Sequence, residues 1–536
     1  MKPTRQRAGL TPLTQAFLGA CFFGLLVWAY LPALRGGFIW DDDAYVTENQ
    51  TLRNLSGLWE IWFDPSATPQ YYPLVHTSYW IEHHFWGLNP LGFHLTNLGL
   101  HVFASLLLWR VLSVLQISGA WLAAALFACH PVQVESVAWV TERKNVLSAV
   151  FYFSAALAFF RFYELGAQKV SWRRAFFYGL AFFLYMAALL SKTITCSLPA
   201  ALLLIIWWKS GTLRSRDFLA VAPMFMVGIV FSIGTVFLEQ NHVGASGPEW
   251  LLSFAERVLI AGRALWFYIF KLIVPANLIF IYPRWQLAPH LWWQWLYPSA
   301  ALLVLFSMWR FRALLGRGPL VAVLFFAGTL FPALGFVNVY PMRYSFVADH
   351  FQYLACVGVF VLFASGACRF PRLILIPVAL LLVFLGLSRQ QAAAYVDVKI
   401  LWESTLRKNP SCWMAHNNLG MIFKEEGRID EAVVHYREAL RLNSEYPEAH
   451  YNLGIVSYQS KQIDDALFHF QAAVRLKPED AEARNNLGAT LRAKGRLDEA
   501  IFQFREALKL KPDYDLAWLN LARTIEIRRA LSRGAF

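Results

Sequence analysis

Long apolar runs recur through the first three quarters of the chain and constrain its fold more than any other feature. A helix needs about 20 predominantly apolar residues to cross a bilayer. Eleven runs approach this length, at about 13–34, 94–115, 118–130, 146–162, 174–191, 194–209, 217–238, 291–309, 319–337, 352–368 and 372–388. Only 15% of the residues are charged, against about a quarter in soluble domains. The sequence therefore predicts an all-α fold in which residues 1–390 form a multi-span membrane domain.

The basic residues between these runs predict the side of the membrane on which each loop lies. Cytoplasmic loops carry an excess of Lys and Arg. With the basic N-terminal end in the cytoplasm, the clusters at 310–317 and 369–372 fall there too. The outer side then holds the C-terminal region and four long loops, at about 35–93, 131–145, 239–290 and 338–351. We expect a bacterial inner membrane with these parts in the periplasm, rather than the endoplasmic reticulum with these parts in the lumen.

One further apolar segment, at residues 255–275, does not fit this alternation. It carries Arg257, Arg263 and Lys271 at helical spacing. Counting it as a crossing would place the basic cluster at 310–317 outside, against the positive-inside rule. It is therefore predicted to be an interfacial or re-entrant helix on the outer side.

From about residue 396 the chain repeats itself with a period of 34 residues. The triplet Asn418-Leu419-Gly420 recurs as Asn452-Leu453-Gly454, Asn486-Leu487-Gly488 and Asn520-Leu521-Ala522. This is the period of tetratricopeptide repeats, in which each helix pair buries its apolar face against its neighbours. The sequence predicts a repeat domain at 391–536 with units at about 411–444, 445–478 and 479–512, flanked by a half-repeat at 398–408 and a final capping helix.

The net charge of +13 does not indicate a nucleic-acid partner. Most of the basic residues lie in short loops between apolar runs, where they set the topology. The six cysteines have no CxxC spacing, so neither a disulfide framework nor a zinc centre is predicted.

Three consecutive carboxylates, Asp41, Asp42 and Asp43, follow the aromatic segment Phe38-Ile39-Trp40 in the first outer loop. Their mutual repulsion favours protonation or a cationic partner. A divalent cation held by these hard oxygen ligands is one interpretation, and it would be the only cofactor. The plain alternative is a solvated turn that keeps the loop outside.

Cationic side chains gather at the outer surface, against the usual charge distribution. Such groups are suited to the phosphate of a lipid or of a lipid-linked substrate. Ionisable groups at membrane depth are costly and often functional. The candidate phosphate-binding residues are Arg143, Lys144, Lys192, Arg343 and His350. For the pair in the second loop, headgroup anchoring or pairing with Glu142 is the alternative.

Several short motifs occur in a fixed order along the chain. They are Phe38-Ile39-Trp40-Asp41-Asp42, Tyr72-Pro73-Leu74, Gly87-Leu88-Asn89-Pro90 with Gly92-Phe93-His94, His130-Pro131 with Glu135, Ser191-Lys192, Val347-Ala348-Asp349-His350 and Tyr353-Leu354. Together with the two-part architecture they resemble the transmembrane-and-tetratricopeptide-repeat family of O-mannosyltransferases and its bacterial relatives, which are GT-C glycosyltransferases. The resemblance covers nearly the whole chain.

The resemblance implies transfer of a hexose such as mannose from a polyprenyl-phosphate carrier to a hydroxyl of a protein, on the outer face and with inversion. In such enzymes an acidic residue of the first outer loop acts as base. Asp41 and Asp42 are thus implied as the catalytic pair, and Glu135 as an acidic residue near donor or acceptor. The chain departs from the eukaryotic members at Tyr72, where they often carry Arg, and at 142–144, where they usually have Gly-Arg-Ala-Asp.

The repeats are expected to bind the protein acceptor. The first helix of each pair lines the concave surface, where four asparagines would hold an extended peptide: Asn418, Asn452, Asn486 and Asn520. The alternative is that these asparagines satisfy packing between repeats.

Two other classes of function stay open. An O-oligosaccharide ligase or polymerase of the bacterial envelope generally places its key basic and histidine residues in one large late loop, whereas the acidic run here lies in the first. A non-catalytic membrane-anchored scaffold explains the repeats, but not the polar groups that gather on one side of the membrane.

Overall fold

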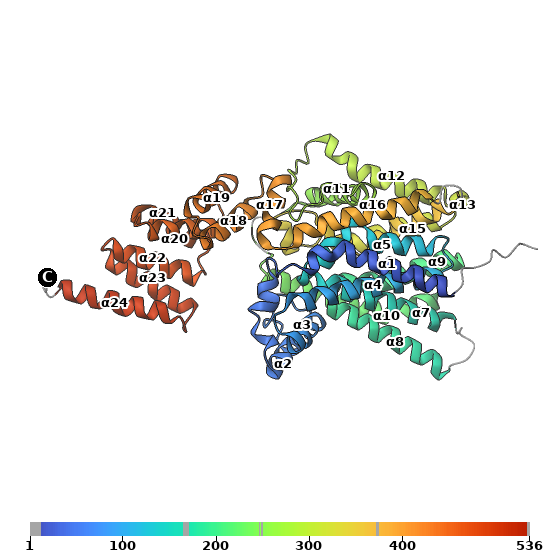
Figure 1. The fold of residues 1–536 in the computed structure, drawn as a ribbon, viewed down its shortest axis with the longest axis horizontal. Helices are drawn as coiled ribbons and strands as arrows, with labels where there is room; N and C mark the ends of the chain where they lie inside the picture. Colours follow the sequence, from blue (N-terminus) through green and yellow to red (C-terminus); the bar gives the residue numbers. More distant parts are fainter. Residues whose placement is uncertain (1–11, 165–170, 246, 248–249, 371–374, 533–536) are drawn as a thin grey trace, which may run out of the picture. The chain divides into compact units, whose positions relative to one another are not determined.

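The computed structural model describes residues 12–164, 171–245, 247, 250–370 and 375–532, which form helices joined by loops (Figure 1). Within these ranges there is no β-strand, and the predicted all-α fold is confirmed. The chain divides into two compact units, Met1–Leu401 and Trp402–Phe536.

The first unit contains the apolar helices and the loops that join them. Its helices are α1 Pro12–Leu34, α2 Leu55–Phe63, α3 Pro73–Trp86, α4 Pro90–Val114, α5 Ala120–Cys129, α6 Val134–Ala138, α7 Arg143–Glu164, α8 Trp172–Ser191, α9 Leu198–Ser210, α10 Ser215–Asn241, α11 Phe254–Ile273, α12 Leu296–Arg310, α13 Arg312–Leu315, α14 Gly318–Leu330, α15 Cys356–Ala367 and α16 Leu375–Ala392.

Six helical stretches in the described part of the chain are long and apolar enough to cross a membrane. They are α4, α8 and α10, and the stretches Val140–Glu164, Thr193–Ser210 and Leu375–Tyr395, which contain α7, α9 and α16 with the short helices next to them. Four shorter apolar helices, α1, α5, α14 and α15, coincide with predicted spans. The remaining predicted span corresponds to α12, which has 15 residues. The chain is thus a multi-pass membrane protein, while the number of eleven crossings stays a prediction.

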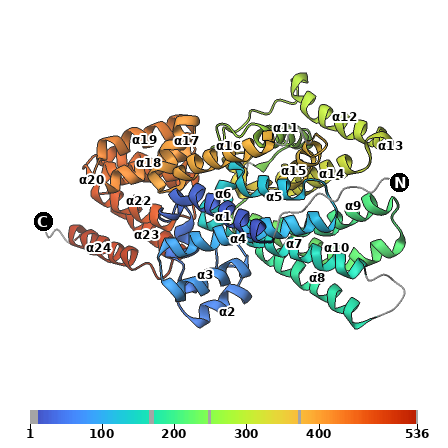
Figure 2. The same ribbon diagram turned by 45° about the vertical axis from the view of Figure 1, so that its right-hand side comes forward.

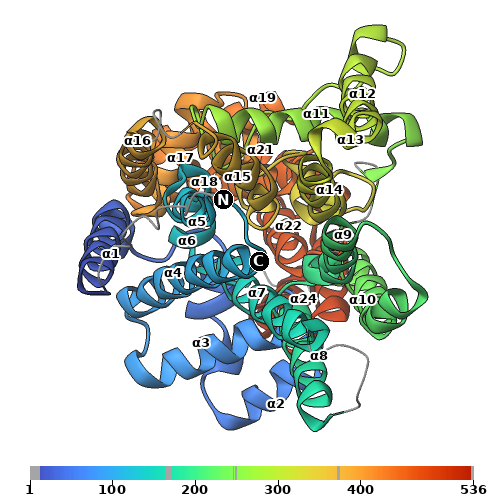
Figure 3. The same cartoon turned by 90° about the vertical axis from the view of Figure 1, so that its right-hand side faces the viewer.

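The long helices of this unit run beside one another and turn apolar side chains outward. In Figure 3, α1 lies next to both α4 and α16, and α5 packs against α4 and α16. In Figure 2, α7 and α8 form an antiparallel pair. Along α10, Phe218, Ile229, Ile233 and Phe237 are all at least half exposed. An exposed apolar face of this length is expected where a helix meets lipid, so the pattern agrees with a bilayer environment.

The ambiguous segment at 255–275 forms α11, which begins with a capping box between Ser253 and Glu256. Two of its basic side chains donate hydrogen bonds to backbone carbonyls of the same unit. Arg257 donates to the Gly335 carbonyl at 2.7 Å, and Lys271 donates to the Ala276 carbonyl at 2.7 Å. The predicted position of this helix at the interface stays a prediction.

The second unit is an array of helix pairs. The helix α17 Val398–Lys408, which contains the boundary between the units, is followed by α18 Trp413–Glu425, α19 Ile429–Leu442, α20 Pro447–Gln459, α21 Ile463–Leu476, α22 Ala481–Ala493, α23 Leu497–Leu510 and α24 Asp515–Ser532. The repeated glycine has a packing cause. A Cβ at Gly454 would lie 2.7 Å from the Phe470 ring of the paired helix, and Gly420 and Gly488 are as close to theirs.

Candidate active site

The first outer loop turns sharply at Trp40, whose φ of 47° lies in the left-handed region. A bulky side chain is strained there, and such strain persists only when the surroundings impose it. Here the Trp40 ring stacks on Trp139 with centroids 5.5 Å apart and meets Phe280 edge-on at 5.1 Å. This aromatic packing fixes the backbone immediately before the acidic run.

Asp42 is fully buried, and both of its oxygens are occupied by protein donors. The Ile39 N–H donates to Oδ2 at 2.9 Å. Thr141 donates to Oδ1 twice, from its N–H at 2.8 Å and from its hydroxyl at 2.6 Å. Asp42 therefore joins the first outer loop to the second. The neighbouring Asp43 is exposed and accepts a bond from Thr47 at 3.0 Å.

Asp41 differs from its neighbours because its Oδ1 is buried and has no hydrogen-bond partner among the described residues. Burial raises the pKa of Asp41 to about 7, although the attraction of Lys144 opposes the rise. The negative charges of Asp42 and Glu142 add to it. A carboxyl with this pKa can accept a proton near neutral pH, which is what a general base must do.

Two lysines share one carboxylate beside this aspartate. Glu142 ends the short turn η4 Val140–Glu142, and its Oε1 lies 3.0 Å from Lys144 Nζ. Its Oε2 lies 3.3 Å from Lys192 Nζ. Asn145 completes the group, because its amide donates to Glu142 at 2.6 Å and its carbonyl accepts from Lys192 at 2.7 Å.

The pair formed by Lys144 and Lys192 can still bind an anion. Two ammonium groups against one carboxylate leave a net charge of about +1 when all three are ionised. An ammonium has three N–H donors. In the described structure Lys144 uses two of them, on Glu142 and on Gln70 at 3.3 Å, and Lys192 uses two on Glu142 and Asn145. One donor of each lysine is left for a ligand.

Glu135 and His350 form a second pair at the edge of the same cluster. The His350 backbone N–H donates to Glu135 at 3.2 Å, and Nδ1 of the ring lies 3.0 Å from the other carboxylate oxygen. The opposite ring nitrogen, Nε2, is 3.8 Å from Glu142. The structure thus brings together five of the residues predicted from sequence: Asp41, Glu135, Lys144, Lys192 and His350.

Arg143, the neighbour of Lys144 in α7, contacts α3 and α4, and its assignment as a phosphate-binding residue stays a prediction. The guanidinium is fully buried, with one donor 2.6 Å from Glu82 and others on Asn97 and the Phe93 carbonyl. Consecutive residues of a helix point in different directions, and here Arg143 contacts Glu82 whereas Lys144 contacts Glu142. Its role is to hold α7 against α3 and α4.

Three residues without a motif extend the cluster toward the late loop. Gln70 accepts from Lys144 and donates to Glu239 at 2.8 Å. Glu239, near the end of α10, accepts the Tyr340 backbone N–H at 3.2 Å. Glu239 could have been found as an acidic residue in an apolar helix, whereas Gln70 and Asn145 carry no sequence signal.

The predicted residue Arg343 ends the adjacent turn η9 Tyr340–Arg343, where its side chain lies half-buried over the Tyr344 ring.

The side chains around Asp41–Asp43 are poorly suited to hold a divalent cation. Across the described residues no three His, Cys, Asp or Glu side chains gather as metal ligands. Asp42 accepts only from protein donors, and Glu142 is neutralised by lysines. Lys144 is a cation of the protein that attracts Asp41 and opposes the rise in its pKa that burial causes.

The repeat asparagines mostly contact the neighbouring repeat. Asn452 donates to Asn417 at 3.0 Å, Asn520 donates to Asn485 at 2.9 Å, and Asn486 donates to Tyr451 at 3.2 Å. Asn418, in the first repeat, donates instead to the Met414 carbonyl of its own helix at 3.0 Å. These contacts agree with the packing interpretation.

Family models match the second unit. A "TPR repeat" model covers residues 420–461, and a "Tetratricopeptide repeat" model covers residues 451–515. A solved structure described as "YrrB: a TPR protein with an unusual peptide-binding site" is 28% identical and aligns with 26% of this chain and 69% of its own, at a TM-score of 0.23.

Curated relatives match both units. "Protein O-mannosyl-transferase TMTC1" of Homo sapiens is 26% identical over 507 residues, which cover 82% of this chain and 56% of the relative. "Protein O-mannosyl-transferase F38B6.6" of Caenorhabditis elegans is 22% identical over 445 residues, which cover 76% of this chain and 60% of the relative. The chain therefore spans only about 56–60% of the length of these relatives.

Proposed function

We propose that this chain, which is similar across both units to protein O-mannosyl-transferases and carries tetratricopeptide repeats, transfers mannose or a similar hexose to protein hydroxyls. The donor in this proposal is a polyprenyl-phosphate sugar, and the reaction takes place on the outer face of the membrane. The observation that carries the proposal is the unpartnered buried oxygen of Asp41 beside a lysine pair with donors left over.

Asp41 is the general base in this reaction. A hydroxyl is a poor nucleophile until its proton is removed, and a positioned base contributes about 10²–10⁴ in rate. The raised pKa of Asp41, about 7, matches this work at neutral pH. Asp42 is a positioning residue, because its bonds to Thr141 and Ile39 fix the turn that carries Asp41.

Lys144 and Lys192 hold the phosphate of the donor. A polyprenyl-phosphate sugar is a phosphodiester with one negative charge, which matches the net charge of the lysine pair and Glu142. Negative charge on the phosphate grows as the sugar leaves, and fixed cations stabilise this change in the transition state. Glu135 and His350 help to position Glu142 beside the lysines, because His350 contacts Glu135 and also approaches Glu142.

The step is a single displacement. The acceptor oxygen forms a bond to the anomeric carbon while the bond from that carbon to the phosphate oxygen breaks. The acceptor proton passes to Asp41, and the electron pair of the broken bond stays on the polyprenyl phosphate beside the lysines. Attack from the side opposite the phosphate inverts the anomeric configuration.

The test is the variant Asp41→Asn, compared with Asp43→Asn as a matched control. Both substitutions remove one carboxylate charge, but Asp43 is exposed and lies outside the cluster. With purified protein, labelled polyprenyl-phosphate mannose and a peptide acceptor, we expect Asp41→Asn to lose at least about 100-fold in rate, and the control to keep most of it. Glycopeptide mass spectrometry identifies the product.

Wild-type turnover in Asp41→Asn would exclude this residue as the base. Retention of biological function by an Asp41→Asn/Asp42→Asn double variant would favour the non-catalytic scaffold. A donor of oligosaccharide length, accepted in place of a single hexose, would favour the ligase.

A further inference from the structure

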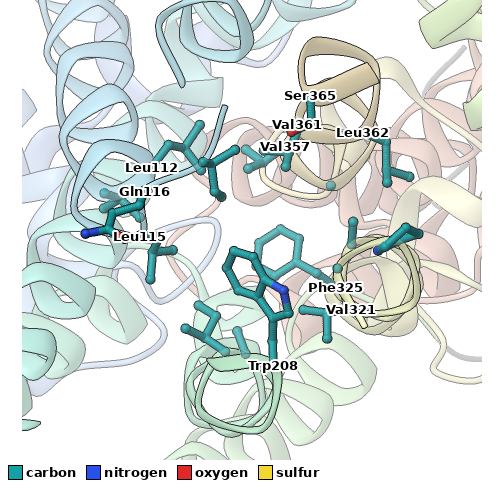
Figure 4. Close-up of a pocket in the computed structure, with 18 of the residues that line it drawn as sticks. Leu112, Leu115, Gln116, Trp208, Val321, Phe325, Val357, Val361, Leu362 and Ser365 are labelled. Carbon is teal, nitrogen blue, oxygen red and sulfur yellow. The ribbon is translucent and has the colours of Figure 1, made fainter. Parts of the chain in front are cut away.

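A second site lies away from the candidate active site, in a cavity of about 550 Å³ between α4, α7, α9, α14 and α15 (Figure 4). Its volume is in the range of ligand pockets, about 300–1,000 Å³. The walls are mostly apolar, with polar side chains such as Gln116, Ser118 and Ser365 among them. Leu112, Val361 and Phe325 approach from three helices, and the Trp208 ring lies between them in Figure 4.

The cavity extends from the middle of α7 and along α9, and its polar end lies away from the lysine pair. Lys144 begins α7, whereas the cavity residue Phe153 lies nine positions further along, about 14 Å away at 1.5 Å per residue. Lys192 precedes α9, whereas Trp208 lies near its end. A phosphate held by the lysines therefore does not occupy the polar end of this cavity.

Two arginines line that polar end. Arg317 precedes α14 and Arg369 follows α15, and the two converge because one helix begins where the other ends. The Arg317 guanidinium rests on the end of α9, 5.6 Å from the Trp207 ring, and stays half-exposed. The side chain of Arg369 is exposed. Within the described residues neither arginine makes an ion pair with a carboxylate.

We infer that this cavity binds an anionic glycerophospholipid of the inner leaflet. An acyl chain fills the apolar space, and the phosphate meets Arg317 and Arg369. Basic pockets between membrane helices on the cytoplasmic side are suited to anionic head groups, and the charge pattern of the chain predicts this side for both arginines. The inference does not rest on sugar transfer, because the site shares no residue with the Asp41 cluster.

The experiment counts lipids on the full chain by native mass spectrometry. The protein is purified in mixed micelles that contain dioleoyl-phosphatidylglycerol and dioleoyl-phosphatidylcholine in equal amounts. The test variant is Arg317→Gln/Arg369→Gln. The matched control is Arg310→Gln/Arg312→Gln, which removes the same charge from the same predicted side at residues that do not line the cavity. Val361→Trp fills the apolar space and leaves both arginines in place.

We expect the wild type and the control to retain one phosphatidylglycerol. Retention falls at least about tenfold in Arg317→Gln/Arg369→Gln, because charged hydrogen bonds to the phosphate are lost. Val361→Trp loses the lipid as well.

Three outcomes would overturn the inference. One is equal retention by the wild type and the test variant. Another is an equal loss in the matched control, which would indicate a diffuse charge effect. The third is displacement of the lipid by glycerol 3-phosphate or by undecaprenyl phosphate, since the first would make the site one for free phosphate and the second one for the donor carrier.

Discussion

At the scale of single residues, the two adjacent carboxyls Asp41 and Asp42 differ because of their partners. The three hydrogen bonds to Asp42 favour its ionised form and limit the effect of burial, which raises its pKa to about 6. Asp41 has a buried oxygen without such a bond, and its pKa rises to about 7. A buried carboxylate oxygen that the fold leaves without a hydrogen bond costs stability and is available for chemistry.

This cost predicts a pH-dependent gain in stability for Asp41→Asn. The pKa of Asp41 is higher in the folded state than its ordinary value of 3.8. Well below pH 3.8 both states hold the proton, and ionisation of this side chain costs nothing. Between pH 4 and 7 the unfolded chain ionises first, so the folded protein loses stability as pH rises, by at most about 4 kcal/mol for this shift. Asp41→Asn removes this loss.

Thermal unfolding in detergent measures this prediction. We expect Asp41→Asn to melt several degrees above the wild type at pH 8, and to approach it as the pH falls well below 3.8. An equal difference at both pH values would mean that the amide acts through packing and not through ionisation. Asp43→Asn, at the exposed neighbour, is the control for a change in surface charge.

At the scale of elements, α11 decides the topology of the second half of the membrane unit. Its charged side chains find protein partners, as Arg257 does on the Gly335 carbonyl and Asn338. If α11 lies at the outer surface, the segment after α12 is cytoplasmic. If α11 crosses, that segment is outside and Arg317 faces the outer leaflet.

A reporter fused after Arg317 distinguishes these arrangements. Alkaline phosphatase folds only in the periplasm, and a cytoplasmic fluorescent protein reports the other side. We expect fluorescence without phosphatase activity at this position. A second pair of fusions, in the 35–93 loop, is expected to show the reverse pattern and checks that both reporters work. Phosphatase activity after Arg317 would break the eleven-span arrangement.

The elements were more predictable than their contacts. Apolar runs and a 34-residue period depend on local sequence, so the helices and the repeats could be located from them. The pairing of Glu142 with Lys192 joins residues 50 positions apart, and no local pattern contains it. Arg143 and Lys144 are both basic and adjacent in the sequence, so the sequence does not distinguish them. They point in different directions from the helix, so Arg143 contacts Glu82 and Lys144 contacts Glu142. The position of charged residues near the outer membrane surface therefore predicted that a polar cluster exists, but not which residues contact one another.

At the scale of the whole molecule, the membrane unit and the repeat unit have separate cores. All residues of the Asp41 cluster lie within Met1–Leu401, whereas the asparagine contacts lie within Trp402–Phe536. The chemistry in our proposal therefore needs only the first unit. The repeats are left for selecting the protein acceptor.

Deletion of residues 411–536 tests this division. We expect the truncated protein to keep activity on a short peptide within about a factor of a few, because no residue of the cluster is removed. Activity on a folded protein acceptor should fall at least about tenfold, as expected when a second binding surface is lost. Both acceptors are assayed with the same donor. Equal loss on both would assign the repeats to folding or assembly.

The way Arg143 anchors α7 also bears on how the second outer loop can change in evolution. Arg143 is fixed by its buried ion pair with Glu82. This ion pair fixes the rotation of α7, and with it the direction in which Glu142, Lys144 and Asn145 point toward Lys192 and one another. Inserting one residue between Glu142 and Arg143 would turn the preceding turn by about 100° relative to the helix. Insertions and deletions are therefore expected to be excluded from this stretch. Homologous sequences should keep its length.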